Sequence, residues 1–325
     1  MNWKDQKVLV TGADGFVGGW LAKTLVEKGA YVVTLVRDEK KYSALDLHGI
    51  REKAVVIKGD VTDYYLIKRI LNEHSISFCF HLAAQALVGI ANRSPLSTFE
   101  TNIKGTWTIL EAIREVNNPH FQGIIVASTD KAYGVHEKLP YTEESELLGA
   151  YPYDASKVCA DVLARSYAVA YNLPVAVTRK ANVYGGGDLN LSRIVPDAIR
   201  CLIQGEELLI RSDGTPERDY LYIKDAVSGY VTLAENLHRA EVRGQAFNFS
   251  SGKPVSVLEL VNLISKTHGS EIRPKILGHA KNEIDRQFLA NGKARAVLGW
   301  SPQYGLEEGM KETIEWYKSY FKSVN

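Results

Sequence analysis

The sequence has 325 residues, a formal net charge of +1 and 24% charged residues. This length allows one large α/β unit or two modest domains, with a core that needs no disulfide or metal. The balanced charge argues against a nucleic-acid or anionic-membrane partner. Three cysteines without a CxxC pair predict no disulfide framework and no metal site, and they are typical of a reducing cytoplasm.

Membrane segments are not predicted either. The N-terminal "MNWKDQKVLV" lacks the apolar core of a signal peptide, and no later run approaches the length needed to span a bilayer. We therefore expect a cytoplasmic protein.

Short apolar runs alternate with helical patterns through the first half of the chain. Strands are predicted at residues 7–12, 31–36, 54–60, 77–84, 123–129 and 175–185. Helices are predicted at residues 16–29, 64–74, 96–116 and 153–171. This alternation indicates βαβ units and a parallel sheet, and the unalternating strands indicate cover on both faces. We predict an α/β fold with a doubly wound parallel sheet of the Rossmann type.

The pattern becomes less regular after about residue 183. Helices are predicted at residues 194–207, 256–269 and 305–321, and a short strand followed by a helix at 218–236. We predict a Rossmann domain at 1–182 and a smaller mixed α/β substrate domain at 183–325. "AFNFSS" leaves open a return of the chain to the first domain, near 219–250.

A glycine-rich turn follows the first predicted strand and opens a helix. In "TGADGFVGGW", Gly12, Gly15 and Gly18 form G-x-x-G-x-x-G. Such glycines let the backbone turn tightly and approach a pyrophosphate at the positive end of the helix. Because the strand–turn–helix context is present, NAD(P) binding is favoured over an ordinary turn.

The end of the second predicted strand bears on the choice between NAD and NADP. In "LVRDEKK", Arg37 precedes Asp38. An arginine can accommodate the 2′-phosphate of NADP, whereas an acidic residue binds the ribose hydroxyls of NAD. This order favours NADP slightly, while Lys40 and Lys41 could equally belong to a solvated loop.

A carboxylate also ends the next strand. Asp60 could contact the adenine, and a simple strand cap is the competing interpretation. The predicted cofactor-binding residues are Gly12, Gly15, Phe16, Val17, Gly18, Arg37, Asp60, Val61, Leu82, Ala83, Ala84, Tyr153 and Lys157.

"YDASK" places Tyr153 and Lys157 four residues apart on a predicted helix, hence on one face. A free phenol titrates near 10, but a neighbouring ammonium and a cationic nicotinamide would favour the phenolate. That phenolate could take a proton from a sugar hydroxyl. YxxxK alone is a common chance pattern, and the upstream glycine motif makes chance the weaker interpretation.

The segment "VASTDKAYG" is unusual because an apolar strand leads directly into two hydroxyls, a carboxylate and an ammonium group. Ser128, Thr129, Asp130 and Lys131 follow one another without a turn residue before Gly134. A surface ion pair, worth about 0–1 kcal/mol, is the competing interpretation. His81 and His136 are expected to be core or surface histidines.

Five motifs, taken in chain order, resemble those of the extended short-chain dehydrogenase/reductase family. They are TGxxGxxG, "HLAAQ" at 81–85, "TNIKGT" at 101–106, the Ser/Thr strand end and YxxxK. "STDKAYG" resembles its nucleotide-sugar 4,6-dehydratase branch. With "HLAAQALV", "YPYDASK" and "ANVYGGGD…RIVPDAIR", the sequence is most similar to the CDP-glucose 4,6-dehydratases. The resemblance spans essentially the whole chain.

The resemblance implies a nucleotide-diphospho-hexose substrate, a recycled cofactor and a homodimer paired through the helices near 96–116 and 153–171. Tyr153 would deprotonate the 4-hydroxyl, with Lys157 beside it. Thr129 would hydrogen-bond the 4-oxygen, Asp130 would be the acid at the 6-hydroxyl, and Lys131 would be the base at C5. A buried site would favour neutral forms of both Asp130 and Lys131, and a close ion pair would oppose this.

The resemblance also implies a set of substrate contacts, although each arginine taken alone could lie on the surface. The predicted substrate-binding residues are Gln85, Asn102, Asn182, Arg193, Arg218 and Arg286. "GTPERDYLYIKD" looks more like the dTDP-glucose dehydratases and 4-epimerases, which leaves the nucleotide base and the hexose open.

Two alternatives to a dehydratase remain. A 4-epimerase or reductase of the same family usually has small or hydroxyl residues after the strand Ser/Thr, so Asp130 and Lys131 discriminate against it. A binding module that no longer turns over would tend to lose Tyr153 or Lys157, and both are present.

Overall fold

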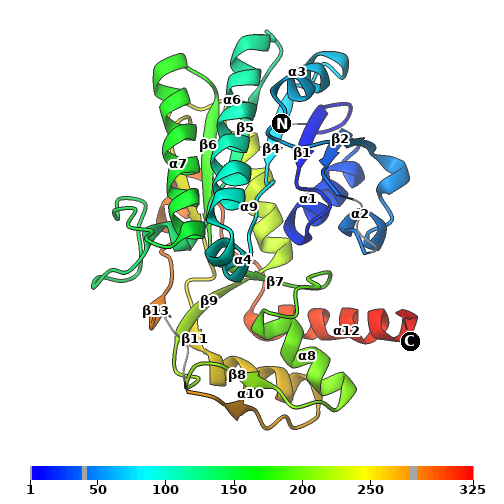
Figure 1. The fold of residues 1–325 in the computed structure, drawn as a ribbon, viewed down its shortest axis with the longest axis vertical. Helices are drawn as coiled ribbons and strands as arrows, with labels where there is room; N and C mark the ends of the chain where they lie inside the picture. Colours follow the sequence, from blue (N-terminus) through cyan, green and yellow to red (C-terminus); the bar gives the residue numbers. More distant parts are fainter. Residues whose placement is uncertain (1, 39–41, 279–283, 325) are drawn as a thin grey trace.

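The computed structural model describes residues 2–38, 42–278 and 284–324, arranged as an upper lobe around one large sheet and a lower lobe beneath it (Figure 1). The large sheet has seven strands in the order β10-β6-β5-β4-β1-β2-β3, and every pair in it is parallel. Its strands are β1 (Lys7–Thr11), β2 (Tyr31–Val36), β3 (Val55–Lys58), β4 (Phe78–His81), β5 (Gly123–Ala127), β6 (Val175–Lys180) and β10 (Ala246–Phe249). The predicted doubly wound parallel sheet is confirmed.

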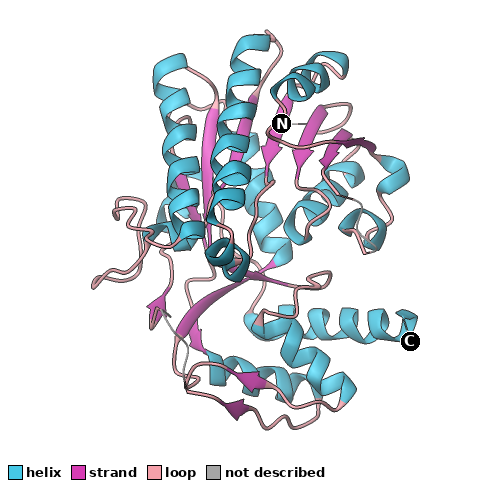
Figure 2. Cartoon of the chain, in the orientation of Figure 1, coloured by secondary structure: helices cyan, strands magenta, loops and turns pink. Residues whose placement is uncertain are grey.

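Helices cover both faces of this sheet (Figure 2). One face carries α3 (Tyr64–Glu73), α6 (Gly105–Val116) and α7 (Pro152–Tyr171), and the other carries α1 (Phe16–Glu27) and α9 (Ile223–Asn236). Alternate strand residues enter two separate cores: Val8 and Val10 pack on the side of α1 and α9, and Leu9 packs on the other side. This period of two explains why the strands read as unbroken apolar runs.

Local sequence sets the helix ends. The Asp63 side chain accepts a hydrogen bond from the Leu66 N–H at 3.0 Å and caps α3. Asn117 and Asn172, both left-handed, end α6 and α7. The helix predicted at 96–116 is observed as α5 (Pro95–Phe99), a π-helical turn η2 (Glu100–Lys104) and α6.

The lower lobe has a small mixed sheet of β7 (Asn182–Tyr184), β9 (Glu217–Tyr222), β11 (Pro254–Ser256) and β13 (Arg286–Gln287). A separate pair joins β8 (Leu209–Ile210) to β12 (Lys275–Ile276). Its long helices are α8 (Ile194–Gln204), α10 (Val257–His268) and α12 (Leu306–Val324). The short elements of the chain are α2 (Ala44–Leu47), η1 (Arg51–Lys53), α4 (Val88–Arg93), η3 (Asp130–Tyr133) and α11 (Gly292–Leu298).

The strand predicted at 175–185 is wrong as a single element. β6 ends at Lys180, and after Ala181 the chain leaves the large sheet and pairs as β7 with β9. The chain later returns to the upper lobe, because α9 packs there and β10 pairs with β6. The division at residue 182 stays a prediction. Within the described residues, none of the helices combines the length and apolar character needed to cross a membrane.

Candidate active site

The glycine turn lies at the carboxyl end of β1. Gly12 has φ +76°, and a Cβ there would lie 2.8 Å from the backbone nitrogen of Ala83. A Cβ on Gly18 would lie 2.7 Å from the Gly12 carbonyl carbon, so α1 packs directly on the turn. Gly15 precedes Phe16 and has no side chain to cap the helix. The first N–H groups of α1 therefore suit an anionic group such as a pyrophosphate.

The end of β2 presents both candidate groups for the adenosine ribose. Arg37 donates a hydrogen bond from Nε to Asp38 Oδ2 at 2.7 Å, and both side chains are exposed. This hydrogen bond to Asp38 raises the pKa of Arg37. Lys40 and Lys41 lie outside the described residues.

The other predicted cofactor residues lie at neighbouring strand ends. Asp60 Oδ1 accepts hydrogen bonds from the backbone and hydroxyl of Thr62, each at 2.8 Å, so this carboxylate caps the local turn. Beside β4, the N–H of Ala83 donates to Thr11 Oγ1 at 3.1 Å. The structure places Val61 in the core, and Leu82 and Ala84 half-buried in the segment after β4.

Asp130 begins η3, after Ser128 and Thr129 have followed the end of β5. It is 2% exposed; Oδ1 accepts a hydrogen bond from the Thr129 hydroxyl at 2.9 Å. Its second oxygen, Oδ2, has no hydrogen-bond partner among the described residues. Burial raises the pKa of Asp130, and the charge of Lys131 opposes this effect. The protonated carboxyl, which can donate a proton, is therefore favoured.

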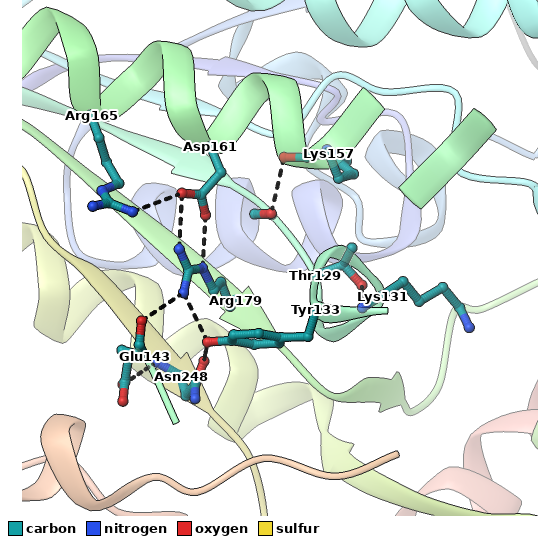
Figure 3. A network of polar contacts seen from close by, with 10 residues as sticks. Thr129, Lys131, Tyr133, Glu143, Lys157, Asp161, Arg165, Arg179 and Asn248 are labelled. Carbon is teal, nitrogen blue, oxygen red and sulfur yellow. Dashed lines mark hydrogen bonds and ion pairs between the residues drawn. The ribbon is translucent and has the colours of Figure 1, made fainter. Parts of the chain in front are cut away.

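Lys131 differs from its neighbour because it is only half-buried. Its backbone N–H donates to the Thr129 hydroxyl at 3.4 Å, which caps the start of η3. The side chain extends away from the polar contacts around Tyr133 (Figure 3). Within the described part of the chain, Lys131 Nζ forms no hydrogen bond or ion pair, so this amine is available to a ligand.

Tyr153 and Lys157 occupy the first turns of α7, and both are buried. Burial raises the pKa of Tyr153 to about 12, Arg193 lowers it and Asp130 raises it further. Lys157 Nζ donates to the carbonyl oxygen of Ala127 at 2.8 Å, and burial lowers the pKa of Lys157 to about 8. Burial is thus the largest effect on the pKa of Tyr153, and the phenolate expected beside Lys157 and a cationic nicotinamide stays a prediction.

Asn102 ties together three parts of the site. Its Oδ1 accepts a hydrogen bond from the Gln85 N–H at 2.7 Å, and its Nδ2 donates to Ser156 Oγ at 2.8 Å. The π-helical turn carries this side chain into the interior, where it is 1% exposed. Asn102 thus fixes the segment after β4 against α7.

Gln85 and Asn102 belong to the upper lobe, and the other predicted substrate residues come from the lower lobe. Arg193, which pairs with Asp188 at 2.8 Å, and Arg218 on β9 act electrostatically on Tyr153 and Asp130, respectively. Arg286 instead donates to the Glu217 carboxylate at 2.7 Å. Asn182 begins β7 and donates to the Asp219 carbonyl at 3.5 Å. Arg218 donates from Nη1 to the carbonyl oxygens of Glu217 at 2.9 Å and Asp285 at 3.3 Å, and Arg286 is 59% exposed on the neighbouring edge strand β13.

A buried network holds the turn that carries Asp130 and Lys131 (Figure 3). Arg179 donates to both oxygens of Asp161, at 2.8 and 3.0 Å, and to the Tyr133 hydroxyl at 2.9 Å. The same hydroxyl donates to Asn248 Oδ1 at 2.8 Å. Tyr133 is the last residue of η3, so the network links this turn to α7, β6 and β10.

His81 is a core residue. Its two ring nitrogens contact the hydroxyls of Thr11 at 2.9 Å and Thr106 at 3.1 Å. Burial lowers the pKa of His81 to about 3, so the ring is neutral. His136 contacts the Tyr133 and Glu146 carbonyls, each at 3.0 Å. The described residues contain no cluster suited to holding a metal ion.

Two buried residues of this region were missed in the sequence. Asp154 is 6% exposed; burial raises its pKa to about 6, Lys131 lowers it and Asp130 raises it. Lys180 ends β6 and is 7% exposed. Both residues lie inside motifs that the sequence had already singled out. The signal for Lys180 was a charge at the end of a mainly apolar strand, and the signal for Asp154 was its position next to Tyr153.

The chain matches known proteins over almost its whole length. It is 28% identical over 338 residues to CDP-glucose 4,6-dehydratase of Salmonella typhimurium, covering 98% of this chain and 92% of that protein. It is 27% identical over 322 residues to human dTDP-D-glucose 4,6-dehydratase, covering 97% and 91%.

Solved structures agree with these sequence relatives. UDP-glucose 4-epimerase of Thermotoga maritima has a TM-score of 0.89 and 29% identity, covering 97% of this chain and all 100% of that one. A dTDP-glucose 4,6-dehydratase of Streptomyces venezuelae, solved with NAD, has a TM-score of 0.86 and 26% identity, covering 98% of both chains. A family model described as GDP-mannose 4,6 dehydratase matches residues 9–313. The chain therefore belongs to the GDP-mannose 4,6-dehydratase family.

Proposed function

We propose that this protein is a nucleotide-diphospho-hexose 4,6-dehydratase, which converts its substrate to the 4-keto-6-deoxy sugar and water. One observation carries the proposal: Asp130 is buried with an unpartnered carboxyl oxygen, and Lys131 beside it has an unpaired amine within the described residues. Removal of water across C5 and C6 needs one acid and one base side by side. The similarity to CDP-, dTDP- and UDP-glucose 4,6-dehydratases supports the same reaction.

The turn at Gly12 and the uncapped start of α1 fit a dinucleotide, because a Cβ at Gly12 would press on Ala83. The residues proposed to hold it are the cofactor-binding set given above. When bound, the oxidised dinucleotide would supply a hydride acceptor for C4 and, once reduced, the hydride donor for C6, so that the reaction would consume no cofactor.

The roles of the side chains follow from the proton balance. Tyr153 takes the proton of the 4-hydroxyl, and the Thr129 hydroxyl donates to the developing 4-oxygen. Lys131 removes the C5 proton, which the 4-ketone has made acidic, and later returns it to C5. Asp130 gives its proton to the departing 6-hydroxyl, which leaves as water. Asp130 then regains a proton as Tyr153 loses one, so the cycle has no net proton change.

For the substrate we favour a CDP-glucose-like nucleotide sugar. Gln85 and Asn182 would position the sugar and its glycosyl phosphate, Asn102 would act through the Gln85 backbone that it holds, and Arg193, Arg218 and Arg286 would bind the diphosphate. Support comes from Arg193 and Arg218, whose charges act on Tyr153 and Asp130. The match to the Salmonella typhimurium enzyme supports a cytidine nucleotide.

A 4-epimerase is the second candidate, because the Thermotoga maritima UDP-glucose 4-epimerase has a TM-score of 0.89. Epimerisation needs Tyr153 but has no use for an acid at C6. The buried carboxyl of Asp130 therefore favours the dehydratase.

The deciding experiment supplies the protein with CDP-, dTDP-, UDP- and GDP-hexoses in separate reactions with catalytic NAD or NADP. Mass spectrometry should show the loss of one water from a single nucleotide sugar, with no net reduced cofactor. Interconversion of that sugar with its C4 epimer, without water loss, would contradict the dehydratase and favour the epimerase.

We further propose a slight preference for NADP over NAD, carried by Arg37. Asp38 weakens this preference for NADP. Its carboxylate pairs with Arg37 at 2.7 Å and could instead accept hydrogen bonds from the ribose hydroxyls of NAD. The solved dehydratase of Streptomyces venezuelae contains NAD. The test measures the affinity of wild type and of Arg37→Ala for NAD and for NADP. If Arg37 contacts the 2′-phosphate, Arg37→Ala should bind NADP more weakly than wild type does and bind NAD equally well.

We also propose a cytoplasmic homodimer. Support for a reducing compartment comes from Cys79, Cys159 and Cys201, which are all free. Support for the dimer comes from apolar side chains left exposed on α6 and α7, among them Trp107, 45% exposed, and Val162, 53% exposed.

A further inference from the structure

The segment that follows β7 is held between the two lobes. Residues 185–187 are glycines, all of them buried, and Asp188 after them is 3% exposed. The segment lies between α1 of the upper lobe and α12 of the lower lobe (Figure 1). We call residues 185–188 the interlobe segment. Arg193, one of the predicted substrate arginines, follows shortly after it along the chain.

Side chains from both lobes fix the interlobe segment. Trp20 on α1 donates a hydrogen bond from Nε1 to the Gly186 carbonyl oxygen at 2.7 Å. A Cβ on Gly186 would lie 2.3 Å from Cγ of Trp316 on α12, so this helix packs directly on the segment. The Tyr317 hydroxyl, also on α12, donates to the Asp188 carbonyl oxygen. The interlobe segment is therefore anchored to one helix of each lobe.

The carboxylate at the end of this segment holds a substrate arginine. Asp188 Oδ2 accepts a hydrogen bond from Arg193 Nη1 at 2.8 Å, and Oδ1 accepts one from the Asn190 N–H at 3.2 Å. The Asp188 side chain is 5% exposed, whereas that of Arg193 is 42% exposed. A guanidinium has five N–H donors in a fixed fork. The contact with Asp188 thus orients Arg193 and leaves donors for an anionic ligand.

We propose that Trp20 and Asp188 are positioning residues, which act through the interlobe segment to hold Arg193 where it binds the substrate diphosphate. α1 then serves both ligands, because its first turn faces the proposed cofactor and Trp20, further along the helix, supports the substrate arginine. The indole N–H is a donor only, so phenylalanine at this position keeps an apolar ring and loses the support. The diphosphate as ligand rests on the proposed function; the connection between Trp20 and Arg193 does not.

The deciding measurement is a double-mutant cycle on ligand binding. CDP, dTDP, UDP and GDP are titrated calorimetrically into protein saturated with the dinucleotide it prefers, and the tightest-binding nucleotide is used. Arg193→Gln should weaken its binding about 10- to 100-fold, and Trp20→Phe about 3- to 10-fold. Adding Trp20→Phe to Arg193→Gln should change binding by less than about twofold, because Trp20 acts only through Arg193.

Trp3→Phe is the matched control. Trp3 is 3% exposed and donates from Nε1 to Glu235 Oε1 at 2.8 Å, so the substitution removes a comparable indole hydrogen bond outside the interlobe segment. This variant should bind the nucleotide as wild type does. Equal weakening in Trp3→Phe and Trp20→Phe would show a general structural effect and refute the positioning role. A Trp20→Phe effect that persists in full without Arg193 would also overturn the proposal.

A measurement without substrate tests the connection itself. Indole N–H signals of the ¹⁵N-labelled protein are recorded by NMR, and the Trp20 and Trp3 signals are assigned by their loss in the two phenylalanine variants. Arg193→Gln should shift the Trp20 signal and leave the Trp3 signal in place. An unmoved Trp20 signal would overturn the connection between the two residues.

A second variant and a second readout keep the two proposals separate. Tyr317→Phe removes the other anchor of Asp188, should weaken nucleotide binding as Trp20→Phe does, and serves if that variant does not fold. If wild type binds none of the four nucleotides, the proposed substrate class fails, and the NMR comparison still decides whether Trp20 and Arg193 are connected.

Discussion

Burial acts in opposite directions on the acids and the amines of this site. It raises the pKa of Asp130, which favours the protonated acid, and it lowers the pKa of Lys157 to about 8. Both shifts favour the neutral form of the side chain. Burial likewise raises the pKa of Tyr153 to about 12, which favours its neutral phenol.

Lys131 is the residue whose removal separates oxidation from water loss. We expect Lys131→Met to bind cofactor normally and to oxidise C4, but to exchange the C5 hydrogen with solvent at least about 100-fold more slowly. Deuterium incorporation at C5 measures this step. Lys138→Met, which removes an exposed lysine of the next loop, is the control. Unchanged C5 exchange in Lys131→Met would assign the base role to another group.

Asp154 predicts a pH dependence of stability. Its pKa is raised from 3.8 to about 6 in the folded chain, so the folded state holds a proton that the unfolded state releases between these values. Stability from this group is therefore present below about pH 4 and is lost as pH rises to about 6. The free energy of unfolding of Asp154→Asn, minus that of wild type, should therefore be larger at about pH 8 than at about pH 5. Urea unfolding at both pH values checks this, and an equal difference at both would show that Asp154 ionises without cost.

At the scale of elements, the turn η3 is held by a side-chain network in addition to its own backbone hydrogen bonds, such as that from the Gly134 N–H to the Lys131 carbonyl at 3.2 Å. Tyr133 links it to Arg179 at 2.9 Å and to Asn248 at 2.8 Å. Arg179 in turn is neutralised by Asp161, which is 0% exposed. Breaking a buried pair of this kind leaves an uncompensated charge. The position of Asp130 thus depends on residues from α7, β6 and β10.

The contact between α1 and the glycine turn predicts a second effect. A Cβ at Gly18 would lie 2.7 Å from the Gly12 carbonyl carbon, so Gly18→Ala must push the helix away from the turn. We expect a loss of about 1–3 kcal/mol in the free energy of unfolding, together with weaker cofactor binding. Urea denaturation and cofactor titration measure both.

Gly292→Ala is the matched control for that change. A Cβ at Gly292 meets no heavy atom within 4 Å, and this residue begins α11. Its stability should change by less than about 1 kcal/mol. Equal losses in the two variants would remove the packing explanation.

The elements of the large sheet were predictable because each strand is an apolar run bounded by turn residues, as in residues 31–36. The order of motifs along the chain likewise predicted that Asp130, Tyr153 and Gly12 belong to one site. The departure of the chain at Ala181 was not predictable, because "VAVTRKANVYG" does not show that its second part pairs with β9. Burial of Lys180 also depends on α9, fifty residues later.

At the scale of the whole molecule, α6 and α7 carry several exposed large apolar side chains: Trp107, Val162, Val169 and Tyr171. Val162 is 53% exposed and Val169 is 87% exposed. For the proposed homodimer these helices would pack against their copies. Val162→Glu should place charges in that interface and shift the sedimentation coefficient toward the monomer.

Val135→Glu is the control, because Val135 is 68% exposed and lies outside these helices. It should sediment as wild type does. A wild-type protein that is monomeric at working concentration would contradict the dimer, and a dimeric Val162→Glu would place the interface elsewhere.

The path of the chain between the lobes limits how its specificity can change. The chain passes downward at Ala181, upward between Tyr222 and Ile223, and downward again after Phe249. A single recombination crossover at Ala181 between two relatives would therefore take β10 from a different parent than the other six strands of the large sheet. New sugar specificity is expected to arise by point substitution within the lower lobe, and a designed chimera would have to exchange at least two separate stretches together.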